Sequence, residues 1–202
     1  MTVSGALFGK SLDTLARPSL NLAAPSAVDI DASIISVPLR KLGDFLLQYG
    51  SNPTLFLARS SRGSFSAILN AMEVEGAPIE PSFDAAVAEL LILVIDSLAE
   101  PLFPRNLRSI FERPVSSLSQ AEEVAQLLPP ENYCLFRWLM KCTGAFVKAA
   151  RLLSPSIERL ACLFAVVLFQ AGDASDDYGT MQRTQFLLFY LSDDPYQLGS
   201  PG

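Results

Sequence analysis

The sequence predicts an all-α protein, a bundle of several helices in one domain. Apolar residues recur every three or four positions along most of the chain, which is the period of a helix with one buried face. Alternation of apolar and polar residues, the period of a half-buried strand, is scarce. The chain has 202 residues, and 50% of them are hydrophobic, which is enough to build a large core.

The first two predicted helices lie in the N-terminal half of the chain. The first ends at Gly50, a residue type that often terminates helices. Its apolar face contains Leu39, Leu42, Leu46 and Tyr49, with Phe45 beside them. The second ends at Glu100-Pro101, because a residue before proline disfavours helical geometry. Its wide apolar stripe, which predicts a central position in the bundle, contains Val87, Leu90, Leu91, Val94, Ile95 and Leu98.

The C-terminal half predicts three more helices. One is entered through Pro129-Pro130, and its apolar stripe contains Leu135, Trp138, Leu139, Cys142, Phe146 and Leu153. The next has Ser154 as N-cap and Pro155 in its first turn. Its buried face contains Ile157, Leu160, Ala161, Phe164 and Leu168. A last short helix is predicted at Phe186–Leu191.

Composition also suggests how the chain is organised. Pro18–Ser33 and Gly172–Thr180 have the composition of loops. We expect residues 1–35 to form an N-terminal segment with a short helix and a Pro/Ala/Ser-rich loop, 36–192 the helical domain, and 193–202 a flexible tail. Asp173, Asp176 and Asp177 lack the spacing of a calcium-binding loop, so we expect a flexible acidic loop there.

Charge and residue content exclude several classes of function. The net charge is −6, no basic run dominates the chain, and no nucleic-acid-binding motif is present. The chain has no histidine, which removes histidine-based catalysis and histidine metal sites. We predict no metal and no other cofactor. The longest apolar runs fall well short of the ~20 residues that a membrane span needs. We therefore expect a cytoplasmic location, with peripheral association at membranes left open.

The three cysteines are an odd number and form no CxxC pair. Cys134, Cys142 and Cys162 all lie in stretches with helical spacing. This pattern is typical of reduced core thiols in an intracellular protein.

Several short motifs follow one another in order between Phe8 and Leu191. They are Phe8-Gly9 with Leu12, Val37-Pro38-Leu39, Thr54-Leu55-Phe56-Leu57-Ala58-Arg59-Ser60, Leu98-Ala99-Glu100-Pro101-Leu102, Leu128-Pro129 with Asn132, and Leu160-Ala161. In this order and at these spacings they resemble the RhoGAP domain, which activates Rho-family GTPases. The resemblance implies a multi-helix bundle and a Rho-family or related small GTPase as the partner.

The same resemblance implies that the catalytic arginine is missing. The family places its arginine finger directly after the phenylalanine of the first loop, and Leu57 stands at that position. Leucine has neither charge nor hydrogen-bond donor, so it cannot replace that arginine. Arg159 stands in place of a family asparagine, and Val166-Val167 in place of a Pro-Asn pair. A family lysine and arginine are replaced by Ile92 and Asp96. The resemblance thus implies a degenerate member without independent catalytic activity.

Three hypotheses about function stay open at this level. The first is a protein-interaction domain that binds or scaffolds a GTPase, with Leu57, Arg59, Arg62 and Arg159 as candidate contact residues. The second is a weak or atypical activator that uses Arg59 as a displaced finger, or Arg62 after it. The third is a structural helical domain that binds no GTPase.

One basic surface could serve a further partner. Arg137, Lys141 and Lys148 share one helical face, with Arg151 beside it. A solvated face and a docking strip for an acidic protein, an anionic lipid or a membrane-associated protein both fit this pattern.

Overall fold

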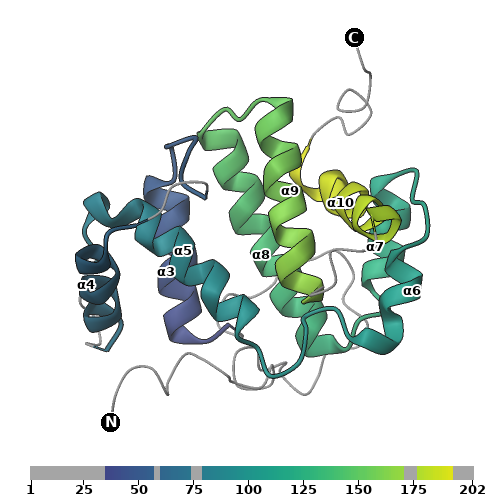
Figure 1. Cartoon of the computed structure of the whole chain (residues 1–202), viewed down its shortest axis with the longest axis horizontal. Coiled ribbons are helices and arrows are strands. Elements are labelled where there is room, and N and C mark those ends of the chain that lie inside the picture. The colour runs from purple at the N-terminus through teal and green to yellow at the C-terminus, as the bar shows by residue number, and fades with distance from the viewer. Residues whose placement is uncertain (1–34, 57–59, 74–78, 171–176, 193–202) are drawn as a thin grey trace.

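A computed structural model describes residues 35–56, 60–73, 79–170 and 177–192 of the chain (Figure 1). These residues form eight α-helices and two short 3₁₀ turns, with no β-strand among them, which confirms the all-α prediction. No helix in these ranges is long and apolar enough to cross a membrane. The α-helices are α3 Val37–Tyr49, α4 Arg62–Glu73, α5 Asp84–Asp96, α6 Arg108–Phe111, α7 Leu118–Ala125, α8 Pro130–Ala149, α9 Ser154–Phe169 and α10 Asp177–Leu191.

Helix α5 has the central position that its wide apolar stripe predicts. It packs against α3, α4 and α9, and all six residues of the stripe are buried. The helix ends at Asp96, earlier than the predicted end at Glu100-Pro101. The side-chain amide of Gln170 donates hydrogen bonds to the carbonyl oxygens of Asp96 and Leu98, each at 3.0 Å. These bonds satisfy backbone acceptors that an ending helix leaves open.

Helix α3 confirms the predicted stop at Gly50 but not the predicted burial of Tyr49. The Gly50 N–H donates to the Leu46 carbonyl, and a Cβ added at Gly50 would lie 2.3 Å from that oxygen. The backbone angle φ of Gly50 is −74°, so the glycine is required by this close approach and not by a left-handed conformation. Tyr49 is 37% exposed and rests on Phe45 at the end of the helix, with 5.0 Å between ring centroids.

The connection between α8 and α9 corrects two predictions. Leu153 is 76% exposed, because the chain leaves the helix at Ala150 and turns through Arg151, whose φ is 49°. Leu153 is therefore out of phase with the α8 stripe, whose other members are buried. Ser154 is the first helical residue and not the N-cap, and its hydroxyl donates to Glu158.

The C-terminal part of the bundle is held together by aromatic rings. Helix α10 begins at Asp177, well before the predicted Phe186, so the end of the predicted loop Gly172–Thr180 is helical. The remainder of that loop, with Asp173 and Asp176, lies outside the described residues. Helices α4, α6 and α7 were not predicted from the sequence. Ring centroids 4.3–5.9 Å apart link the loop before α6 with α6, α8, α9 and α10. The rings belong to Phe103, Phe111, Phe136, Phe169 and Phe186.

Candidate functional site

Three of the four contact residues that the sequence predicts belong to the loop between α3 and α4 or to the first turn of α4. Leu57 and Arg59 lie outside the described residues. Arg62 is the first residue of α4, and its side chain also lies outside the described part. The residues on either side of Leu57–Arg59 are described, and they determine how this loop is attached to the bundle.

The first attachment is apolar and comes directly before Leu57. Leu55 is completely buried. The Phe56 ring packs edge-on against Phe146 of α8 and Phe164 of α9, with centroids 5.0 and 5.7 Å apart. Aromatic pairs in this geometry favour a defined arrangement beyond simple burial. The chain therefore leaves the core at Phe56 with little freedom of register.

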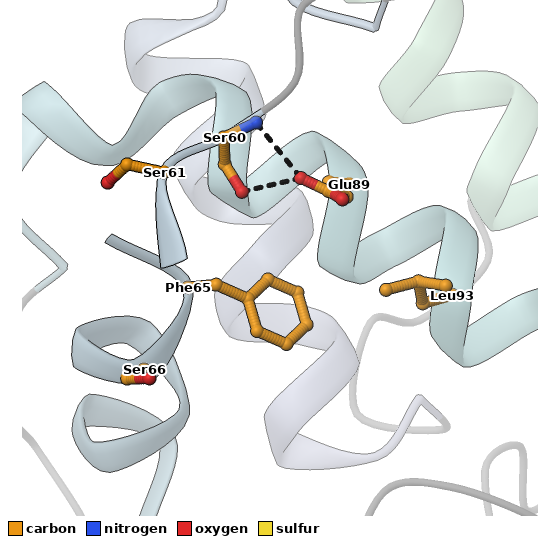
Figure 2. Close-up of a pocket in the computed structure, with 6 residues that line it drawn as sticks. All are labelled: Ser60, Ser61, Phe65, Ser66, Glu89 and Leu93. Carbon is orange, nitrogen blue, oxygen red and sulfur yellow. Dashed lines mark hydrogen bonds between the residues drawn. The ribbon is translucent and has the colours of Figure 1, made fainter. Parts of the chain in front are cut away.

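The second attachment is polar and joins the loop to α5 at two points. The Asn52 amide donates to Asp84, at the start of α5, over 3.1 Å. The Ser60 N–H and hydroxyl both donate to Oε2 of Glu89, over 3.1 and 2.5 Å (Figure 2). Hydrogen bonds to a carboxylate are stronger than those between neutral groups. The described ends of the loop are thus fixed to the central helix.

A pocket lies between α4 and α5 beside the second attachment (Figure 2). Its volume is about 330 Å³ and it is open to solvent. Glu89 contributes the charged group of its lining, while Phe65 and Leu93 contribute apolar surface. We call it the Glu89 pocket, and its lining residues are Ser60, Ser61, Phe65, Ser66, Glu89 and Leu93.

The outward faces of α5 and α9 carry the remaining predicted site positions. Arg159 and Asp96 are exposed, and Ile92 is half-buried. Val166 is 46% exposed, whereas Val167 is buried and cannot contact a partner. Since α5 and α9 pack against each other, these positions lie on neighbouring helices.

All charged residues of α5 are acidic. Its thirteen residues include three acids, Asp84, Glu89 and Asp96, and no basic residue. The roles of Asn52, Asp84 and Glu89 were not predicted from the sequence. One signal for Glu89 was present, since it is the only charged residue between Ala85 and Ile95 in an otherwise apolar helix.

The predicted basic strip on α8 is not uniform. Lys141, Lys148 and Arg151 are exposed. Arg137 is instead half-buried and forms an ion pair with Glu122 of α7 over 2.9 Å. Arg137 therefore belongs to a polar network between helices, and the prediction that it lies on a solvated strip is wrong.

The cysteines divide in a similar way. Cys134 and Cys142 are buried, as predicted for core thiols, whereas Cys162 is exposed on α9. Burial raises the pKa of the Cys142 thiol to about 12. The core assignment of Cys162 is wrong, because its position faces away from the buried stripe of α9. Trp138 is buried, which confirms its predicted place in the core.

Comparison with known proteins gives consistent results. The sequence profile of the RhoGAP domain matches residues 36–173. The structure is similar to human Rho GTPase activating protein 15 (ARHGAP15), with a TM-score of 0.70, 16% identity, and coverage of 93% of this chain and 89% of that one. It is also similar to the BH domain from GRAF, the GTPase regulator associated with focal adhesion kinase, with a TM-score of 0.62, 10% identity, and coverage of 81% and 95%. No curated protein matches the sequence significantly.

Proposed function

This chain belongs to the RhoGAP domain family, and on that premise we propose that it binds a Rho-family GTPase without supplying an arginine finger. The observation that carries the proposal is the anchoring of Phe56 between α8 and α9. Leu55 is buried and Phe56 packs on two rings. Both contacts support the alignment in which Leu55 and Phe56 occupy the apolar positions of the family motif. The residue that follows Phe56, where the family resemblance places the finger, is Leu57.

The chemistry of GTP hydrolysis explains why this substitution matters. Negative charge develops on the transferring phosphoryl group, and an inserted guanidinium stabilises it, which is worth ~10³–10⁵ in rate. A leucine side chain offers no charge and no donor, so it leaves that charge unstabilised. Binding does not require the finger, because affinity arises from the whole contact surface and not from one inserted cation.

A shift of two residues that places Arg59 at the finger position has an unfavourable consequence. It would assign Ala58 to the place of the anchored phenylalanine, and Leu55 and Phe56 would lose their apolar equivalents in the motif. The burial of Leu55 and the ring contacts of Phe56 therefore favour the unshifted register. Ile92, Asp96 and Val167 also differ from the lysine, arginine and asparagine that the resemblance implies at these positions.

The first experiment tests binding. Purified domain is titrated against a panel of Rho-family GTPases, each loaded in turn with GDP and with a non-hydrolysable GTP analogue. We expect at least one GTPase to bind, with a dissociation constant that depends on the nucleotide. The absence of any nucleotide-dependent partner would favour a purely structural domain.

The second experiment tests catalysis with the GTPase that binds. Single-turnover hydrolysis is measured with the wild-type domain and with Arg59→Ala. We expect neither protein to accelerate hydrolysis. An acceleration by the wild type that disappears in Arg59→Ala would overturn the proposal in favour of an atypical activator.

A further inference from the structure

In the Glu89 pocket, only one of the two oxygens of the Glu89 carboxylate accepts hydrogen bonds from the described residues. Both hydrogen bonds from Ser60 fall on Oε2, and Oε1 accepts none from the described residues. Glu89 is half-buried, and its side chain is held in place by the Ser60 contact. A carboxylate oxygen that is held in place and has an open acceptor position is favourable for a cationic donor.

The other walls of the pocket fit the same kind of ligand. The Phe65 ring lies below the Ser60–Glu89 contact in Figure 2, with Leu93 on the α5 side and Ser66 on the α4 side. The Ser66 hydroxyl is exposed and makes no hydrogen bond within the described residues, whereas the Ser61 hydroxyl is engaged by Ser64. An aromatic face beside a carboxylate attracts a planar cation in two ways, through the ring quadrupole and through charge-assisted hydrogen bonds.

We propose that the Glu89 pocket receives an arginine side chain of the docked GTPase, an inference that rests on the function proposed above. The pocket's volume of about 330 Å³ is at the lower end of small-molecule sites, which suits a single inserted side chain. The charge of the described lining fits a cation, because Glu89 is its one charged residue and the α5 helix that carries it has no basic residue. The pocket adjoins the attached end of the Leu57 loop, so an arginine bound there would be close to the proposed contact surface.

The pocket can be tested without the GTPase by titrating ¹⁵N-labelled domain with N-acetyl-arginine amide. We expect saturable shifts of the Ser61, Phe65 and Ser66 amide signals. N-acetyl-citrulline amide, a neutral analogue of similar shape, serves as the matched probe and should cause none. Equal responses to both compounds, or no response to either, would overturn the pocket assignment.

A matched pair of variants separates charge from structure. Glu89→Gln keeps an oxygen that accepts from Ser60, so the loop attachment is preserved while the charge is removed. Glu123→Gln removes a carboxylate from the exposed surface of α7 and is the control. We expect Glu89→Gln to abolish the response to the arginine probe and Glu123→Gln to retain it. A Glu89→Gln domain that responds like the wild type would contradict the inference.

The same variants connect the pocket to the GTPase. We expect Glu89→Gln to weaken GTPase binding at least about tenfold, and Glu123→Gln to leave it unchanged within about twofold. If the GTPase binds wild type and Glu89→Gln equally well, the pocket inference fails and the proposed function stands. If no GTPase binds while the arginine probe still does, the proposed function fails, and with it the assignment of the partner.

Discussion

At the scale of single residues, Gly43 shows how tightly α3 is packed on α8. A Cβ added at Gly43 would lie 2.5 Å from Cζ2 of Trp138 and 3.1 Å from Sγ of Cys142. The first distance is shorter than real contacts allow, and the indole ring is held in the core. Gly144 offers a comparison on α8, because a Cβ there would meet the Tyr190 carbonyl oxygen at an ordinary 3.6 Å.

We therefore expect Gly43→Ala and Gly144→Ala to act in opposite directions. Gly43→Ala overpacks the contact and should lower the free energy of unfolding by about 1–3 kcal/mol. Gly144→Ala should be neutral or should raise it by up to about 1 kcal/mol, because alanine favours the helix over glycine. Urea denaturation of both variants measures the difference. Equal stabilities would mean that the α3–α8 contact is looser than described.

The cysteines give a second prediction at this scale. Cys162 is exposed, while Cys142 is buried and its pKa is raised to about 12, so it is almost wholly protonated near neutral pH. Only the thiolate reacts with disulfide reagents. At pH 8 we expect Cys162 to react rapidly with Ellman's reagent, and Cys134 and Cys142 to react only on unfolding. A Cys162→Ser variant that still shows a fast thiol would contradict this assignment.

At the scale of elements, Glu122 joins three helices. Its carboxylate accepts hydrogen bonds from the hydroxyls of Tyr133 on α8 and Tyr190 on α10, and it pairs with Arg137. Both tyrosines are at least half-buried. A carboxylate that serves three donors fixes α7 against the two longer helices more specifically than apolar packing alone.

Glu122→Ala should be clearly destabilising. Without the Glu122 carboxylate, two tyrosine hydroxyls and a guanidinium lose their hydrogen-bond acceptor. We therefore expect the free energy of unfolding to fall by about 2–3 kcal/mol. Glu123→Ala, at the next position and exposed, should change it by less than about 0.5 kcal/mol. Thermal or urea unfolding of the pair provides the test, and equal effects would show that the network contributes no specific stability.

The same network predicts a loss of stability at alkaline pH. Burial, and then the hydrogen bond to Glu122, raise the pKa of Tyr133 from 10.0 to about 12. Because the pKa is higher in the folded state, Tyr133 contributes to the free energy of unfolding. This contribution is complete below pH 10 and disappears as the pH rises towards 12. We expect the free energy of unfolding to fall over this range, and to fall less steeply in Tyr133→Phe. An unchanged slope in that variant would rule out Tyr133 as a source.

Elements with a continuous apolar stripe could be predicted from the sequence, and the rest could not. Helices α3, α5, α8 and α9 follow from their spacing of apolar residues, whereas α4 was not predicted. The short α6 and α7 have no such stripe, since most of their burial comes from Phe111, Ala121 and Ala125. The first part of α10 was not predicted because it contains a fully buried arginine, Arg183, and a sequence pattern assigns arginine to the surface. In the structure Arg183 donates hydrogen bonds to the Gly179 carbonyl and the Thr180 hydroxyl.

At the scale of the whole molecule, the candidate site combines segments that are distant in the chain. The motif around Phe56 was visible in the sequence, and so was Leu57. The Glu89 pocket was not, because Ser60 and Glu89 are 29 residues apart and meet only when α4 and α5 pack together.

The most direct measurement of the central claim is the rate of GTP hydrolysis by a bound Rho-family GTPase as a function of domain concentration. Leu57→Arg, which adds a guanidinium at the proposed finger position, is compared with the wild type in the same titration. We predict that the GTPase hydrolyses GTP at its intrinsic rate at every concentration of wild-type domain, up to concentrations that saturate binding. A rate that rises with wild-type occupancy, towards the enhancement of ~10³ or more that an inserted arginine provides, would contradict it.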